Sequence, residues 1–447
     1  MIDEVDILWE IEDEHLREAE FLFTTREILL DAPHYTIEEL AAGPDRRLLA
    51  HLDGLIVGGP AVAEHLLLTT IAEAQDEEDL EKVAAATLAL LVEPDRQLCL
   101  RVLALLDEAK PEQRGGVVRA LQLARHAWID DWLIQTLAAA SVAGLAARLE
   151  ALATSSIVPG PWLRACLASD DLAVVRAAAR LARRSHDDAT LAALGPLAQA
   201  QDVELRRITL ESALCRHVPG AWESAVYWAL GPDESAVRRD ALTWVAHFGD
   251  AAARTELLAR LDDPSHRVDV LWALGFAGSP VAVDRCIDLL ADDELGRFAA
   301  EVICAITGLP THQDRFWRAE PADEREEEHA LPPLEHDDLD ADLVPPPEVS
   351  LPIPEPEPIA AWWRARRADF DPALRYLGGV PLSGEQFLLG LRQAPMRRRH
   401  ALAFELAVRT GGASFLDTRA LGMAQRVQLD GLPELGHLDC QRGLAIR

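Results

Sequence analysis

Five aspartates recur at nearly constant spacing along the middle of the chain, and this period constrains the fold more than any other feature. They stand 30 or 31 residues apart, each just ahead of an arginine and an Ala/Leu-rich stretch: Asp171, Asp202, Asp233, Asp263 and Asp293. A period of this size with two helices per repeat is typical of HEAT-like, or armadillo-like, repeats, in which each hairpin buries its apolar face against its neighbours. We therefore predict an all-α solenoid of α-α hairpins.

Each aspartate stands where the N-cap of the second helix in its repeat is expected, because a carboxylate there accepts hydrogen bonds from free backbone amides. An arginine follows four or five residues later in every repeat: Arg176, Arg207, Arg238, Arg267 and Arg297. We expect these arginines to reach the aspartates of their own or adjacent repeats in a ladder of ion pairs. Since such networks are common structural features, we interpret the period as structural rather than catalytic.

Changes in composition divide the chain into four parts. Residues 1–76 form a helical N-terminal module without the period, 77–308 the HEAT-like solenoid, 309–358 an acidic proline-rich insert, and 359–447 a helical cap. The cap holds 13 Arg and no Lys against 8 Asp plus Glu, a net charge of +5. We therefore expect the acidic insert to fold back onto the basic cap.

Charge and cysteine content exclude several classes of protein. The formal net charge of -32 would repel a phosphate backbone, so nucleic acid is a poor partner. Six scattered cysteines without a C-x-x-C pair favour neither a zinc ribbon nor a disulfide framework. The acidic start is unlike a signal peptide, and no apolar run reaches the length of a membrane span. We expect a cytoplasmic protein that needs no metal or cofactor and has no membrane partner. Its oligomeric state is left open.

Motifs near both ends are more distinctive than the repeats. The N-terminal side carries A-P-H-Y at Ala32–Tyr35 and A-H-L-D-G-L at Ala50–Leu55, and the C-terminal side carries PMRRRHALAFEL from Pro395. In these motifs the chain resembles a proteobacterial family of HEAT-like-repeat proteins whose genes accompany type VI secretion effector clusters. The resemblance implies a genomic setting beside effector, spike and adaptor-like components, and it implies no defined reaction.

The motifs of the common enzyme classes are missing. The sequence has no phosphate loop, no G-x-G-x-x-G turn, no G-x-S-x-G elbow, and none of the His-Glu dipeptides that a di-iron site on such repeats uses. His34 or His51 could act as a general base oriented by Asp53, but no nucleophile stands nearby. A histidine between apolar helices is more often a packing residue, so we expect no enzymatic activity and assign no catalytic residue.

Candidate protein-interaction residues lie in the non-repeating ends. The run Arg397, Arg398, Arg399 and His400 must be partly exposed or paired, and it suits either the acidic insert or an acidic partner surface. Two tryptophans could anchor a partner or seat the cap on the last repeat, and four N-terminal residues complete the set: Trp362, Trp363, His34, Tyr35, His51 and Asp53.

These observations favour a non-enzymatic scaffold or adaptor that holds another protein on the curved inner face of the solenoid. With the resemblance, they predict an accessory or effector-loading protein of a type VI secretion system. Two alternatives stay open. One is an enzyme with a site around the N-terminal module, and the other is an immunity protein that binds a toxin on the same face.

Overall fold

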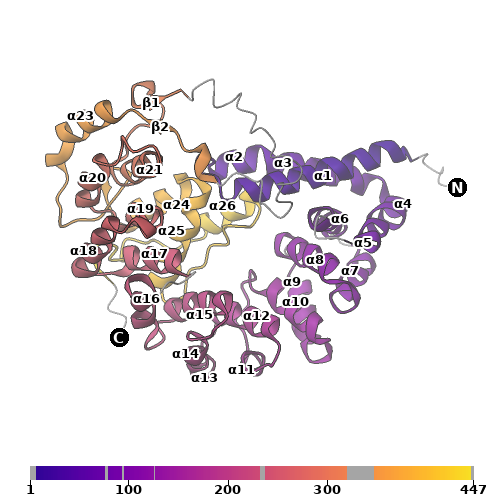
Figure 1. Ribbon diagram of the computed structural model, residues 1–447. Coiled ribbons are helices and arrows are strands. Elements are labelled where there is room, and N and C mark those ends of the chain that lie inside the picture. The colour runs from indigo at the N-terminus through magenta and orange to yellow at the C-terminus, as the bar shows by residue number, and fades with distance from the viewer. Residues whose placement is uncertain are drawn as a thin grey trace, which may run out of the picture.

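The computed structural model describes residues 7–75, 79–92, 95–124, 126–231, 237–319 and 347–443. Within these ranges most of the chain is helical, and the helices stack as successive hairpins in a curved array (Figure 1). The predicted all-α, solenoid-like fold is therefore confirmed. No single described helix has the length and apolar composition of a membrane span, although the pair Ile37–Val57 and Gly59–Glu73, bent by 106°, passes that test together.

The elements follow one another in chain order. The N-terminal module contains α1 (Trp9–Leu29), α2 (Ile37–Ala42), α3 (Pro44–Val57), α4 (Gly59–Val62), a π-helical turn (Ala63–Leu67) and α5 (Leu68–Glu73). The hairpin array contains α6 (Leu80–Val92), α7 (Arg96–Glu108), α8 (Pro111–Leu123), α9 (Ala127–Gln135), α10 (Val142–Leu152), α11 (Leu163–Leu167), α12 (Leu172–Ala182), α13 (Asp188–Ala192), α14 (Leu194–Leu197), α15 (Val203–Cys215), α16 (Ala221–Leu230), α17 (Arg238–Phe248), α18 (Ala251–Ala259), α19 (Arg267–Ala277), α20 (Pro280–Ile287) and α21 (Gly296–Thr307). The C-terminal part contains α23 (Pro356–Arg366), α24 (Gly384–Gln393), α25 (Met396–Arg409) and α26 (Gly422–Asp430).

The second helix of each hairpin forms the inner layer of the array. In α12 the apolar residues Val174, Ala177, Ala178 and Leu181 follow the i, i+3, i+4, i+7 spacing of one helix face, and all are buried. Their small or branched side chains let α12 pack closely between α10 and α15, and α19 repeats this arrangement between α17 and α21. Burial of this stripe by its neighbours is what holds each hairpin in the stack.

Two of the five aspartates cap the helices predicted for them. Asp171 accepts a hydrogen bond from the Val174 amide at 3.1 Å, and Asp202 accepts one from Leu205 at 2.7 Å. Asp263 instead caps a short 3-10 turn that precedes α19.

The last aspartate cap is displaced by one residue. Asp292, rather than Asp293, accepts hydrogen bonds from the Glu294 and Leu295 amides ahead of α21. Adjacent aspartates compete for the same cap, so the sequence alone did not distinguish them. Asp233 lies outside the described residues.

The ion-pair ladder is shorter than predicted. Arg176 does bind the Asp202 carboxylate of the next repeat, with nitrogen–oxygen distances of 2.5 and 3.0 Å. Arg207 instead binds Glu204 and Glu211 of its own helix, each at 2.7 Å. Arg267 donates to a backbone carbonyl at 3.0 Å. Glutamates one turn away on the same helix offer i, i+3 and i, i+4 partners, so local pairs replace the ladder at Arg207.

The two described ends of the acidic insert meet each other. Strand β1 (Trp317–Arg318) pairs antiparallel with β2 (Ile353–Pro354), and a second two-residue pair joins β3 (Tyr376–Leu377) to β4 (Val380–Pro381). Glu348 contacts Arg239 at 3.0 Å and Arg397 of the cap at 3.4 Å. This end of the insert therefore docks on the cap, as expected, while residues 320–346 lie outside the described ranges.

The C-terminal helices lie inside the curve of the array. Figure 1 shows α24, α25 and α26 in yellow beside the inner helices, between the repeats and the N-terminal module. Helix α25 contacts both α15 and α17, and α26 contacts α2. The inner face that we expected to be free for a partner is thus partly filled by the chain's own helix.

Candidate functional site

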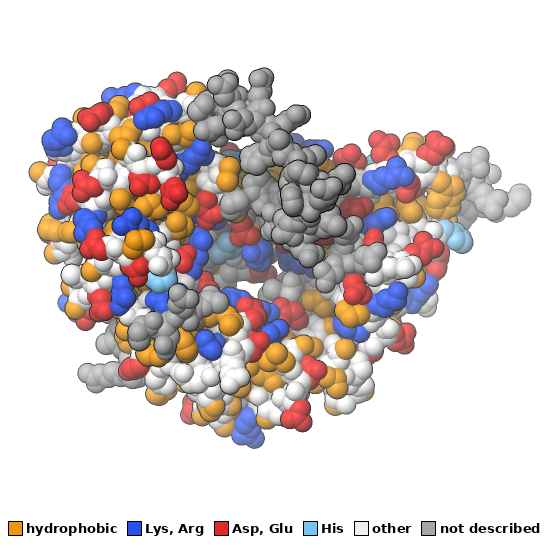
Figure 2. Space-filling model, viewed as in Figure 1, with side chains coloured by type: hydrophobic (Ala, Val, Ile, Leu, Met, Phe, Trp, Pro, Cys, Tyr) orange, Lys and Arg blue, Asp and Glu red, His pale blue; other side chains and the backbone are white. Residues whose placement is uncertain are grey.

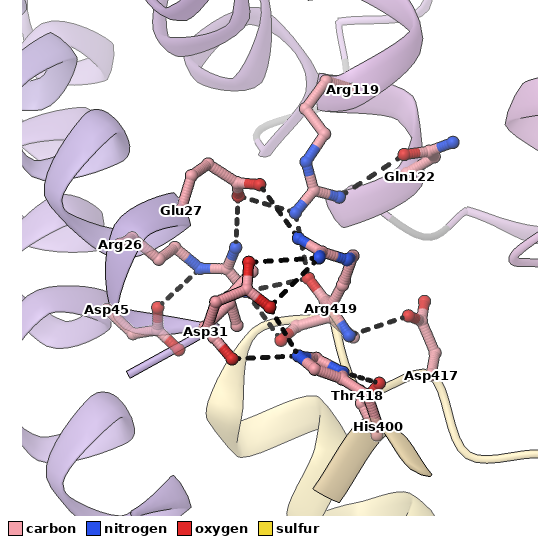
Figure 3. A network of polar contacts seen from close by, with 12 residues as sticks. Arg26, Glu27, Asp31, Asp45, Arg119, Gln122, His400, Asp417, Thr418 and Arg419 are labelled. Atoms are coloured by element: carbon pink, nitrogen blue, oxygen red, sulfur yellow. Dashed lines mark hydrogen bonds and ion pairs between the residues drawn. The ribbon is translucent and has the colours of Figure 1, made fainter. Parts of the chain in front are cut away.

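A buried arginine at the end of α1 joins the N-terminal module to the C-terminal segment (Figure 3). The Arg26 side chain is fully buried and donates to Asp45 at 2.8 Å and to the carbonyls of Arg419 and Ala420 at 2.9 and 2.7 Å. Asp45, at the start of α3, also accepts a hydrogen bond from the Gly422 amide at the start of α26. Burial raises the pKa of Asp45, and Arg26 opposes that effect. One ion pair therefore fixes three elements.

A second set of contacts surrounds this pair. His400 on α25 lies 2.9 Å from the Leu30 carbonyl and 2.6 Å from the Thr418 hydroxyl. Because a carbonyl only accepts, Nε2 of His400 is the donor to Leu30. Asp31 lies 3.4 Å from His400 and 3.3 Å from Arg419. Although burial alone would raise the pKa of Asp31, His400 and Arg419 lower it.

A cavity of about 620 Å³ lies between the inner helices and the C-terminal segment. Its walls come from α8, α10, α12, α15, α17 and α19 on one side and from α25 and the segment after it on the other. Figure 2 shows a hollow with charged side chains near the centre of this face. The charged groups of the lining are Arg119, Arg180, Arg183, Arg207, Arg397, Arg419, His400, Asp31, Glu150, Glu211, Asp240 and Asp417.

The guanidinium groups of this cavity are engaged within the chain. Arg119 binds Glu27 at 2.6 Å, Arg180 binds Glu150, and Arg397 binds Glu301 at 2.9 Å. Paired charges of this kind hold long side chains in one geometry and give the cavity rigid polar walls.

Asp240 differs from these groups. Among the described residues it has no hydrogen bond or ion pair, although it lines the cavity and is only partly exposed. Burial, reinforced by the carboxylate of Glu211, raises the pKa of Asp240 to about 6. Burial and Glu211 likewise raise the pKa of Cys215, another lining residue, to about 12 against the lowering effect of Arg183, so its thiol stays protonated at neutral pH and is a poor nucleophile. The cavity thus offers an unpaired acid and no activated thiol.

A second buried network anchors the other side of α25. Glu405 is fully buried and accepts hydrogen bonds from Arg375 at 2.8 Å, Arg409 at 2.7 Å and His247 at 2.5 Å. Although burial alone would raise the pKa of Glu405, Arg375, His247 and Arg409 hold it well below its usual range. Burial lowers the pKa of His247, so a neutral imidazole donates to the carboxylate.

The arginine run, predicted to pair with the acidic insert or with an acidic partner, lies inside the protein. Arg397, Arg398 and Arg399 are all buried, with exposed fractions of 6%, 5% and 0%. Arg398 donates to the Gly275 carbonyl at 2.8 Å and lies over the Phe276 ring, and Arg399 donates to Leu391 and Gln425. Arg397 pairs with Glu348, so it follows the alternative in which the run pairs with the acidic insert. Arg398 and Arg399 instead hold α25 against its neighbours.

The paired tryptophans seat α23 on the hairpin array. Trp363 is buried and its indole NH donates to Asp284 of α20 at 2.8 Å, and Arg367 donates to the same carboxylate at 2.9 Å. Trp362 is half-buried and packs edge-on against Phe316. Of the two predicted roles, the contact with the last repeats is the one observed.

The N-terminal candidates do not converge on the cavity. None of His34, Tyr35, His51 and Asp53 is among its lining residues. His34 is exposed and stacks edge-on with Tyr35, while the His51 ring lies 3.0 Å from His15 and Asp53 is exposed. The trio proposed as a general base and its orienter therefore lies outside this cavity.

Sequence reasoning missed Arg26 and Glu405, and a signal for each is present. Arg26 continues the buried α1 stripe of Leu16, Ala19 and Phe23 at helical spacing, so it occupies a core position. Glu405 likewise falls between the buried Leu402 and Leu406. A charged residue on an apolar face indicates a buried partner, but sequence does not give that partner's identity.

Comparisons add little to this picture. No protein-family model and no curated protein matches the chain. Among solved structures, an engineered protein from the Northeast Structural Genomics Consortium is 18% identical, with an alignment that covers 66% of this chain and 90% of that one and a TM-score of 0.31.

Proposed function

We propose that the chain is a non-enzymatic scaffold or adaptor that binds another protein through its inner groove. The observation that carries the proposal is the position of α25, which lies against α15 and α17 as the helix of a partner would. Beside it the same groove stays open as the 620 Å³ cavity. A groove that already holds one helix has the shape and chemistry to hold an adjoining polypeptide segment.

The chemistry of the cavity supports binding more than catalysis. Arg119, Arg180 and Arg397 pair with acids within the chain, and its cysteine is held as a thiol. The net charge of -32 favours approach of a basic partner. The motifs at Ala32–Tyr35 and from Pro395 suggest a genomic setting, since the genes of the family they resemble accompany type VI secretion effector genes. We therefore propose an effector, spike or immunity-related protein as the partner class.

Site-directed photo-crosslinking in cells that express the neighbouring genes tests this function. Benzoylphenylalanine would replace Phe415, which lines the cavity, and in a matched control would replace Tyr227, which is exposed on α16. We expect one partner in near-stoichiometric yield from position 415 and not from position 227. If position 415 yields no protein, or both positions yield the same set, the scaffold function is wrong.

The identity of the captured protein separates the variants of the proposal. A toxin whose activity is blocked by the purified chain supports the immunity role, which predicts that deleting the gene makes cells sensitive to a sister cell's toxin. A structural or spike component supports the loading role.

A further inference from the structure

Asp240 presents an unmatched negative charge to the cavity. It lies three and four residues before Thr243 and Trp244 on α17, so all three residues share one helix face, and all three line the cavity. No donor among the described residues lies within hydrogen-bonding distance of its carboxylate. A carboxylate kept out of bulk water without a partner is costly, and such groups are characteristic of binding sites.

The surrounding charges do not neutralise this group. From α15, Glu204 and Glu211 add negative charge, and Arg207 is shared between them at 2.7 Å each. On α17 itself, Arg239 is directed to Glu348 at 3.0 Å, and Arg397 on α25 is paired with Glu301 at 2.9 Å. Arg207 and Arg239 are near enough to lower the pKa of Asp240 in part, but both donate to other carboxylates, and neither forms a hydrogen bond or an ion pair with Asp240.

Two aromatic rings complete this corner of the cavity. Trp244 and Phe404 line it with ring centroids 5.9 Å apart. A third lining ring, Trp272, already carries Arg397 at 4.5 Å and Arg239 at 5.2 Å from its centroid. Among the described residues, no guanidinium lies over Trp244 or Phe404. Trp244 is buried and Phe404 half-buried, so the edges that they present to the cavity are what a cation would meet.

We propose that this corner, formed by Asp240, Glu211, Trp244 and Phe404, binds the side chain of an arginine or lysine supplied by a partner protein. The inference rests on the proposed scaffold function and specifies what the groove recognises. A guanidinium or ammonium group would complete the coordination of Asp240 through charge-assisted hydrogen bonds and pack against the parts of Trp244 and Phe404 that line the cavity.

Other ligand classes fit less well. An anion would meet guanidinium groups that already bind acids or, at Arg183, a backbone carbonyl, and it would lie next to an unpaired carboxylate. A metal ion would lack ligands, because no described group of three or more His, Cys, Asp or Glu residues is placed to hold one. A free amine shares the chemistry of a basic side chain, and the groove that α25 already occupies favours the side chain of a polypeptide.

Calorimetry on the full-length chain tests the site with matched peptides. The probe is acetyl-Gly-Arg-Gly-amide, the neutral control is the same peptide with citrulline, and agmatine represents a free amine. We expect the arginine peptide to bind at least about tenfold more tightly than the citrulline peptide, because one charge-assisted pair is worth that factor. Asp240→Asn should reduce the preference to less than about twofold, and Glu223→Gln, a matched change at an exposed acid on α16, should preserve it.

Three results would overturn the inference. Equal binding of the arginine and citrulline peptides would exclude a cation site, and a preference unchanged in Asp240→Asn would place it elsewhere. Agmatine binding more tightly than the arginine peptide would assign the site to a small amine instead of a protein. Folding of each variant is checked by its unfolding midpoint, so a loss of preference counts only for a folded chain.

The crosslinking experiment distinguishes failure of this site from failure of the scaffold function. If Asp240→Asn leaves the yield of crosslinked partner unchanged, the cation site is wrong and the scaffold function stands. If no partner is captured from wild type but the peptide preference holds, the scaffold function fails, and with it the assignment of the site to a partner protein.

Discussion

Asp240 is an ionisable residue whose environment favours its neutral form. Its folded-state pKa of about 6 lies above the ordinary value of 3.8. Between roughly pH 4 and pH 6 the folded chain therefore holds a proton that the unfolded chain has released, so stability falls as the pH rises through that window. Above it the full cost of the buried charge remains.

Asp240→Asn should consequently stabilise the protein at pH 7. We expect the free energy of unfolding to rise by about 1–2 kcal/mol, measured by urea unfolding, because the amide avoids burial of a charge. The gain should shrink at pH 4, where Asp240 is protonated in the folded state. Glu223→Gln serves as the control and should have little effect at either pH. A variant less stable than wild type at pH 7 would contradict this account.

Glu405 should behave in the opposite way, since Arg375, Arg409 and His247 all donate to it. Glu405→Gln should lower the free energy of unfolding by about 3–5 kcal/mol, because it leaves buried guanidinium groups without their counterion. With a folded pKa well below its usual range, Glu405 adds stability above about pH 4.3 that is lost as the pH falls further. Equilibrium unfolding measures this, and Glu385→Gln at an exposed site on α24 is the control. A loss below about 1 kcal/mol would show that the network is not coupled to folding.

At the scale of elements, α26 depends on a contact from the far end of the chain. Arg26→Ala removes the donor to Asp45 and to the carbonyls of Arg419 and Ala420, so the segment leading into α26 should open more often. We expect amide hydrogen exchange of residues 419–430 to accelerate at least about tenfold, with α19 and α21 unchanged. Arg17→Ala, at an exposed arginine of the same helix, should leave exchange unaltered. Uniform acceleration throughout the chain would indicate global destabilisation instead.

The helices and their caps show which structural features can be predicted from sequence. The hairpins follow from apolar periodicity, as in the buried stripe of Val174, Ala177 and Leu181, because a local pattern determines which face a helix buries. The caps at Asp171 and Asp202 follow for the same reason. These features require only neighbours in sequence.

The site was not predictable in the same way. Helix α25 carries the repeat pattern, yet its partners are α15 and α17, far from it in the chain, and Arg26 meets Ala420 across 394 residues. Sequence places the arginines of residues 397–399 on a helix, but it does not say that their charges are buried. The cavity exists only because this helix returns to the groove, so no local motif identifies it.

At the scale of the whole molecule, the C-terminal segment should associate without a covalent link. Its contacts with the inner helices and with the N-terminal module are extensive and buried, including both the Arg26 and the Glu405 networks. Coexpressed as separate chains, residues 1–330 and 331–447 should copurify through a tag on one of them in equal amounts. The double change Arg26→Ala and Glu405→Ala should abolish copurification. Independent elution of the two wild-type segments would contradict their predicted association.

The contact of Arg26 with the C-terminal segment also has a consequence for biosynthesis. The first part of the groove leaves the ribosome hundreds of residues before the helix that fills it, because the contact between Arg26 and Ala420 spans 394 positions. Contacts of such long range form slowly, and an unfilled inner face exposes apolar surface in the meantime. The nascent chain therefore passes through a stage in which its own groove is vacant, and a protein able to occupy that groove would compete with the chain's C-terminal segment during folding as well as afterwards.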